Sequence, residues 1–248
     1  TYDNSVVKEL NQREGTRGKI KFTHHEGLTD KKTSFSNLSI DFRHNQKIHR
    51  EIILAGRFFY GRFFGQNPQK YLIGGMDNWL FNKKNVANDS PLNLANREET
   101  TTKGVINSQL LFTEFVTSLR GFDYGVLYGE NALLANIELR IPIIRYFHHG
   151  PISSNFFRNL QFTGFYDVGS SWTGNSPFSA NNTISERTEQ QGAFRYSVID
   201  HKNPWLYSYG VGLRTVLLGY YMKFDVAWPV ENFIVQSPRL FVTLGFDF

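Results

Sequence analysis

Apolar and polar residues alternate along much of this 248-residue chain, and helical periodicity is scarce. In segment 133–143, aliphatic side chains at the odd positions alternate with Asn136, Glu138 and Arg140. Similar alternation marks the segments 160–169, 205–217, 220–228 and 240–248 and, more faintly, 36–43. Segment 51–63 is aromatic-rich but mixed, and residues 18–26 are a further candidate strand. A period of two residues is typical of a β-strand whose two faces meet different surroundings. The sequence therefore predicts an all-β protein with about eight strands.

Strand length and aromatic placement favour a membrane barrel over a soluble sheet. Most segments are about nine to fourteen residues long, whereas strands of soluble sheets usually have about five or six and tilted membrane strands have about ten. Aromatic residues such as Trp205, Tyr220 and Trp228 stand near strand ends on the apolar faces, as in the girdles of membrane barrels. A soluble β-sandwich is the alternative, because its strands alternate as well.

The charged residues define which face points inward. A Lys or Arg that faces lipid at mid-membrane costs about 2–4 kcal/mol, and one that faces a wet lumen costs little. Reversing the strands would place Arg140, Arg214 or Lys223 in lipid. We therefore expect the charged sets to face the lumen and the aromatic and aliphatic sets to face the bilayer.

The connections between strands alternate in length. Outer-membrane barrels have short periplasmic turns and long external loops. On this basis we expect residues 44–50, 146–157 and 218–219 to be periplasmic, and residues 28–33, 64–129, 173–203 and 230–238 to be external. The whole chain, 1–248, is then one outer-membrane barrel domain.

Composition excludes several classes of protein. The mean hydropathy of −0.37 is low, as in disordered proteins. Aromatic residues, however, make up 16% of the chain, which is too many for a disordered protein. No apolar run approaches the roughly 18 residues of a spanning helix. The absence of Cys excludes disulfides, Cys-based zinc sites and thiol catalysis. The net charge of +5 is scattered, so we expect no nucleic-acid partner.

Catalytic signals are weak. Residues 169–174 lack the spacing of a nucleophile elbow. The adjacent pairs His24–His25 and His148–His149 would point to opposite faces of a strand and chelate one metal poorly. Glu138 and Asp167 could serve as an acid–base pair, but a nearby Arg would keep both ionised. We expect no enzyme, and no cofactor or metal.

A series of short motifs resembles the Omp85 superfamily of outer-membrane β-barrels. The motifs are Tyr71-Leu72-Ile73-Gly74-Gly75, Ser118-Leu119-Arg120-Gly121-Phe122, Asn136–Pro142, Phe165–Trp172, Tyr209–Arg214, Asp225–Pro229 and Leu244–Phe248. They follow one another in the family's order over about 71–248. The resemblance implies a transmembrane antiparallel β-barrel of sixteen strands, of which this chain would be the C-terminal half.

The resemblance also implies a function and a location. A BamA-like, surface-antigen-type member would assist insertion, assembly or translocation of proteins at the bacterial outer membrane, without a cofactor. Its partners would be outer-membrane lipid and client or accessory proteins. About 44 residues separate Gly75 from Arg120, whereas most members have only a few there. This insert looks most like that of members in which a β-propeller precedes the barrel.

The Arg-Gly-Phe motif gives the first set of candidate site residues. Parity places Glu138 and Asp167 on the lumen face of consecutive strands, and a planar guanidinium can bond to two carboxylates at once. The resemblance implies that the loop with its motif Arg120, Gly121 and Phe122 folds into the lumen and that Arg120 contacts these acids there. We call this arrangement the loop lock. In the alternative, Arg120 is solvated and the acids pair with Arg140 or Arg214.

The C-terminus gives the second set. Leu244, Gly245, Phe246 and Phe248 resemble the family's insertion signal, although a terminal aromatic could also serve as girdle packing alone. Residues 239–248 would form the last strand, whose edge could pair with a substrate strand. Two other functions stay open: a passive or loop-gated pore, and a surface-displayed binding module that uses loops 76–117 and 173–203.

Overall fold

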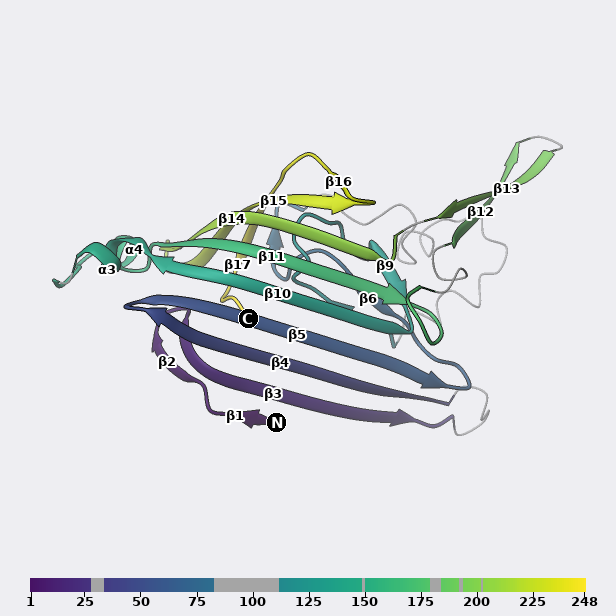
Figure 1. Cartoon of the computed structure of the whole chain (residues 1–248), viewed down its shortest axis with the longest axis horizontal. Helices are drawn as coiled ribbons and strands as arrows, with labels where there is room; N and C mark the ends of the chain where they lie inside the picture. Colours follow the sequence, from purple (N-terminus) through teal and green to yellow (C-terminus); the bar gives the residue numbers. More distant parts are fainter. Residues whose placement is uncertain (28–33, 83–111, 149, 179–183, 192–193, 202) are drawn as a thin grey trace.

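One large antiparallel sheet dominates the computed structural model, which describes residues 1–27, 34–82, 112–148, 150–178, 184–191, 194–201 and 203–248 (Figure 1). Its main strands are β3 (Gln12–His25), β4 (Phe35–His49), β5 (Ile52–Gly65), β10 (Asn131–Pro142), β11 (Gln161–Trp172), β14 (Trp205–Leu217), β15 (Tyr220–Glu231) and β17 (Arg239–Leu244). They lie side by side in chain order. The predicted all-β, antiparallel transmembrane barrel architecture is confirmed.

Four short strands complete the 12-stranded sheet. They are β1 (Tyr2–Asp3) and β2 (Val6–Glu9), which pair with β3, β7 (Trp79–Leu80), which pairs with β17, and β16 (Ile234–Val235), which pairs with β15. The sequence pattern did not predict them, because a strand of two to four residues is too short to show alternation. Within the described residues the sheet stays open between the β1–β3 edge and the β17–β7 edge.

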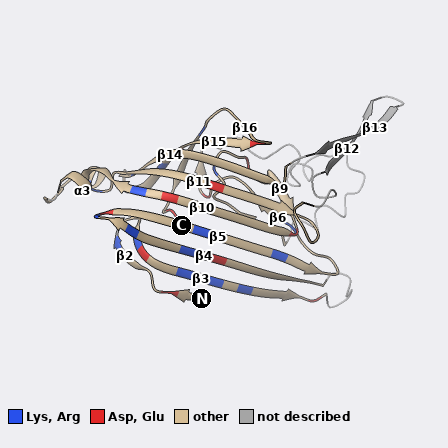
Figure 2. Ribbon diagram, in the orientation of Figure 1, with Lys and Arg blue, Asp and Glu red and all other residues tan. Residues whose placement is uncertain are grey.

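The two faces of the sheet are as the alternation predicted. On β10, the side chain of Ile137 is 54% exposed and faces outward, whereas its neighbour Glu138 is fully buried on the inner face. Figure 2 shows charged residues along the middle of several strands. An exposed aliphatic residue beside a buried carboxylate reverses the pattern of soluble proteins, and it follows from an outer surface that meets lipid.

The two ends of the sheet differ. Two-residue turns connect β4 with β5 and β14 with β15, and the helices α3 (Ile143–Phe147) and α4 (Asn155–Arg158) lie at the same end, on the left in Figure 1. Leu218 and Gly219 both have positive φ, as a tight hairpin turn between twisted strands requires. The predicted turn 44–50 is shorter in the structure, because β4 continues to His49. We call this the short-turn end and the opposite one the long-loop end.

The long connections contain structure of their own. Within the predicted loop 173–203, β12 (Ile184–Gln191) and β13 (Phe194–His201) form a separate antiparallel hairpin (Figure 1). The central part of the insert 76–117 and the whole of loop 28–33 lie outside the described residues. No helix in the described part of the chain is long and apolar enough to span a membrane.

The last strand is shorter than the sequence pattern predicted. Alternation continues to Phe248, but β17 ends at Leu244. Gly245 has φ +102, which turns the chain out of the strand. Asp247 then reaches the interior, where its carboxylate lies 2.9 Å from Arg214 Nε. A glycine that permits the turn and a buried cation that attracts the carboxylate account for the difference.

Candidate functional site: a loop fixed on the inner wall

A small sheet formed by the loop 64–129 covers part of the inner face near the long-loop end. Its strands are β6 (Tyr71–Ile73), β8 (Glu114–Val116) and β9 (Leu127–Gly129), in the order β8–β6–β9. Their apolar side chains pack against the wall in one buried cluster, whose members are Phe35, Phe59, Phe63, Tyr71, Ile73, Val116, Leu119, Phe122, Ala132, Leu134 and Leu206. The lumen is therefore apolar at this level, whereas the sequence pattern predicted only a wet, charged interior.

Tyr71 attaches the loop to the wall by shape and by a hydrogen bond. The hydroxyl end of its ring lies against Gly61 of β5, where a Cβ would be only 2.4 Å from the ring Cζ. The Tyr71 hydroxyl donates to Asn37 Oδ1 on β4 at 2.5 Å. Gly61 is thus required by the close approach of the ring, and the loop is fixed to two neighbouring strands.

The Gly-Gly motif lets the loop turn back on itself. Gly74 and Gly75 have φ of +126 and +75, and a Cβ on Gly74 would lie 2.3 Å from the carbonyl oxygen of Asp123. Gly75 forms a β-bridge with Leu119, and the backbone N–H of Ser118 donates to the Gly75 carbonyl at 3.0 Å. The sequence distance of about 44 residues between Gly75 and Arg120 is therefore closed in space.

Arg120 enters a buried site made by two adjacent strands. Its Nε and Nη2 donate to the two carboxylate oxygens of Asp167 at 2.7 Å each, and its Nη1 donates to Glu138 Oε1 at 2.6 Å. The Arg120 backbone N–H also reaches Asp167 Oδ2, at 3.3 Å. The Arg120 side chain is only 2% exposed and both carboxylates are fully buried. The structure thus brings together the three charged residues that the sequence predicted.

The register between β10 and β11 explains why one guanidinium reaches both acids. Asn136 lies opposite Asp167 and Glu138 lies opposite Phe165, so the two carboxylates are diagonal neighbours on the inner face. The Arg120 guanidinium stacks over the Phe165 ring, with 3.6 Å between its Cζ and the ring centroid. A cation–π contact of this kind is stronger where water is excluded. Phe165 therefore forms the floor of the site.

Gly121 and Phe122 have separate roles beside Arg120. Gly121 has φ +91 and lies against Pro229 of β15, where a Cβ would be 3.0 Å from the proline Cβ. Phe122 is buried in the apolar cluster together with Leu206 of β14. The motif Arg120-Gly121-Phe122 thus combines a charge contact, a close backbone approach and an apolar anchor.

The ion pairs extend beyond the predicted residues. Glu138 Oε2 accepts from Arg140 at 2.8 Å, and Arg214 lies 3.4 Å from Glu138, 2.7 Å from Asp225 and 2.9 Å from Asp247. Lys223 completes the network at 3.4 Å from Asp247. The network holds Arg120, Arg140, Arg214 and Lys223 against Glu138, Asp167, Asp225 and Asp247, so its formal charges balance. Glu138 contacts Arg120 as well as Arg140 and Arg214, so the alternative partners are present, but Arg120 is buried and not solvated.

Several residues of the site were not predicted as such. Asn136 donates to Asp167 Oδ1 at 2.8 Å and to the Ser118 carbonyl at 2.6 Å, and so connects the wall with the loop directly. Its inward parity was visible in the sequence, but no charge singled it out. Phe165 and Asp247 were named only within the motifs Phe165–Trp172 and Leu244–Phe248, because alternation assigns a side chain to a face but does not show which residue it contacts.

The remaining candidate residues lie apart from this network or at its edge. The Phe246 ring is exposed and stacks on Tyr221 at 5.1 Å, and the Phe248 carbonyl accepts from Arg140 Nη2 at 3.1 Å. His24 Nδ1 is within 2.9 Å of Ser36 Oγ, and His25 stacks on Phe35. His149 lies outside the described residues. The role of the tail as an insertion signal stays a prediction.

The fold and the site together define a class of protein. It is a transmembrane antiparallel β-barrel in which a long loop lies on the inner wall and is fixed there by a buried Arg-Gly-Phe motif. Residues 91–241 match the Omp85 superfamily domain, and the chain belongs to this superfamily. No curated protein matches the chain.

Proposed function

We propose that this chain is part of an outer-membrane barrel that assists the insertion, assembly or translocation of other proteins. The observation that carries the proposal is the contact of Arg120 with both Asp167 and Glu138. The loop is held there by the buried ion pairs of Arg120 and by the apolar packing of Leu119 and Phe122 beside it. Such an attachment orders the inner wall while the edge strands stay able to separate.

The edge at β17 supports a role in strand pairing. In the described part of the chain, the edge of β17 away from β15 pairs with the short strand β7 at Val242 and Thr243, and the Leu244 backbone N–H donates to the Asn78 carbonyl at 3.3 Å, so the part of this edge before Val242 has no partner strand. Arg239 and Leu240 lie at the exposed beginning of the strand. A strand edge with unpaired backbone groups can accept a further strand by β-augmentation. We infer that a client strand pairs at this edge. We also infer that the chain belongs to a BamA-like subgroup of the superfamily and forms the C-terminal half of a larger barrel.

Site-specific crosslinking tests this function. A photoreactive residue at Leu240, on the β17 edge, should crosslink to nascent outer-membrane proteins in cells. The matched control is Leu213, an outward-facing residue of β14 that is paired on both sides, with Phe162 and Phe224. Crosslinks to clients at Leu240 and none at Leu213 support the proposal. Equal yields at both positions, or none at either, would contradict it.

A loop-gated pore is the second candidate function, and the same loop favours it. The small sheet β8–β6–β9 covers the inner wall, so its release would widen the lumen. Conductance of the protein in planar bilayers separates the two functions. If the protein is a pore, the wild type should conduct weakly and the Arg120→Ala variant strongly. If it is an assembly factor, Arg120→Ala should lose client insertion without a comparable rise in conductance.

A further inference from the structure

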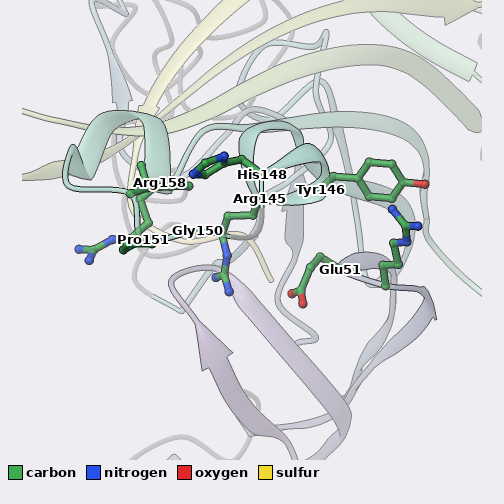
Figure 3. A pocket seen from close by; sticks show the side chains of 9 residues that line it. Glu51, Arg145, Tyr146, His148, Gly150, Pro151 and Arg158 are labelled. Atoms are coloured by element: carbon green, nitrogen blue, oxygen red, sulfur yellow. The ribbon is translucent and has the colours of Figure 1, made fainter.

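A hollow of about 670 Å³ lies at the short-turn end, between the β4–β5 turn and the helices α3 and α4. Figure 3 shows that Arg145 and Arg158 extend from the helical segment and that Glu51 comes from the turn. The charged residues among its described lining are Arg50, Arg145 and Arg158 against Glu51, so the lining is net positive. We call this hollow the basic pocket. It lies apart from the Arg120 network and has no part in the proposed function.

The arginines of the basic pocket present donors suited to an anion. The Arg50 guanidinium lies over the Tyr146 ring, with 5.3 Å between its Cζ and the ring centroid. Arg158 donates through Nη2 to Asn155 Oδ1, and a guanidinium carries five N–H donors in all. His148 lines the same hollow. Planar guanidinium groups bind phosphate oxygens in bidentate fashion, which a single lysine cannot do.

Two exposed aromatic side chains place the basic pocket at the level of a membrane surface. Phe147 at the end of α3 is 78% exposed and Phe157 of α4 is 51% exposed. Each packs edge-on against its neighbour, Tyr146 or Phe156, at 5.1 and 5.2 Å. Aromatic residues beside basic ones are typical of the boundary between headgroups and acyl chains. These aromatic residues favour a phospholipid over a soluble compound as the source of the phosphate.

We propose that the basic pocket binds the phosphate headgroup of an anionic phospholipid in the leaflet at the short-turn end. The phosphate would lie among Arg50, Arg145 and Arg158, and the acyl chains would lie beside Phe147 and Phe157. A zwitterionic headgroup brings its own cation into a positive pocket, so phosphatidylglycerol is preferred to phosphatidylcholine. The inference depends on the membrane-spanning sheet alone, and it holds or fails separately from the role in protein assembly.

Native mass spectrometry of the full chain, released from detergent with added lipid, measures this binding. Wild type should bind phosphatidylglycerol in preference to phosphatidylcholine. Each arginine near a membrane surface contributes about fivefold in affinity, so the triple variant Arg50→Gln/Arg145→Gln/Arg158→Gln should lose roughly a hundredfold. The control removes the same charge at the long-loop end, with Arg62→Gln/Lys70→Gln/Arg239→Gln, and should keep wild-type affinity. If the triple variant does not fold, the three single pocket variants replace it, and each should lose about fivefold in affinity for phosphatidylglycerol.

Three results would overturn the proposal. Equal losses in the pocket and control variants would show binding through net charge alone. The second result has two parts: inorganic phosphate binds as tightly as the lipid, and the double variant Phe147→Ala/Phe157→Ala changes neither affinity. This result would assign the pocket to a soluble phosphate compound. A polyglutamate peptide that displaces the lipid at equimolar concentration would assign it to an acidic protein segment.

Discussion

Arg120 binds both carboxylate oxygens of Asp167 at 2.7 Å, with two different guanidinium nitrogens. A two-point contact fixes the direction of the side chain as well as its position, because neither bond can rotate without breaking the other. The same guanidinium has a third nitrogen on Glu138 and an aromatic ring beneath it. Arg120 thus determines where the loop meets the wall.

Arg120→Ala should destabilise the folded barrel and free the loop. Removal of one partner from a buried ion pair costs about 3–5 kcal/mol, because the Asp167 carboxylate then stays buried without the cation that it pairs with, while Glu138 keeps Arg140 and Arg214. Urea unfolding in detergent, followed by the fluorescence of the four Trp residues, measures the loss. Arg120→Lys keeps the charge but not the fork and should recover only part of the stability. Equal stability of wild type and Arg120→Ala would show that the contact does not hold the loop.

Asp167→Asn should destabilise the protein more than Asp41→Asn, a matched change on the same inner face. Asp167 is fully buried and accepts from Arg120 and Asn136, whereas Asp41 is partly exposed and pairs with Arg43 and Arg57. Charge-assisted hydrogen bonds contribute about 1.5–3 kcal/mol when buried and less near solvent. Two double-mutant cycles combine Arg120→Ala with Asp167→Asn or with Asp41→Asn. The coupling free energy should exceed about 1 kcal/mol for the pair Arg120–Asp167 and not for the pair Arg120–Asp41. A coupling of similar size for Asp41 would contradict the assignment.

Gly61→Ala changes the wall residue that the loop packs against and should disturb the loop. A methyl group there would lie 2.4 Å from the Tyr71 ring, so the ring must move and the loop must shift with it. Overpacking of this kind costs about 1–3 kcal/mol. Limited proteolysis should cut the loop faster in Gly61→Ala than in wild type. Gly164→Ala is the control, because nothing lies within 4 Å of its added methyl group, and its cleavage rate should match that of wild type.

Tyr71→Phe separates the hydrogen bond from the packing at the same place. It removes the bond to Asn37 and keeps the ring on Gly61, so it should cost about 1 kcal/mol in unfolding free energy. Tyr71→Ala removes the ring as well and should cost about 3–5 kcal/mol. If both variants lost the same amount, the ring would contribute nothing and the shape argument would be wrong.

Gly245→Ala should affect the C-terminal tail. An alanine at φ +102 is strained by about 1–2 kcal/mol, so the chain is pushed back toward an extended conformation. Asp247 would then leave Arg214, and β17 would lengthen. The yield of folded barrel in membranes measures the consequence for insertion. Asp247→Asn, which weakens the same contact without strain, should give a smaller defect in the same direction. An unchanged yield in both variants would separate the turned-in tail from insertion.

The sequence by itself determined the strands and their faces. Period-two alternation is a local property of a strand, and the segment 133–143 alone identified Glu138 and Arg140 as inward-facing and Ile137 as outward-facing. The order of the short motifs indicated the superfamily, which the match over residues 91–241 confirmed. Strands of two to four residues, such as β1 and β7, escaped prediction because alternation needs more length to show.

Only the tertiary structure decided which inward-facing residues meet. Parity assigns a face but no distance along it, so the sequence left Glu138 with either Arg120 or Arg140 and Arg214. The register of β10 against β11 places Phe165 opposite Glu138 and Asp167 diagonal to it, and so builds one site for Arg120. The inward turn of Asp247 depends on a cation from a different strand, which no local pattern can contain. Pairing across strands is set by register and closure, and these are properties of the whole sheet.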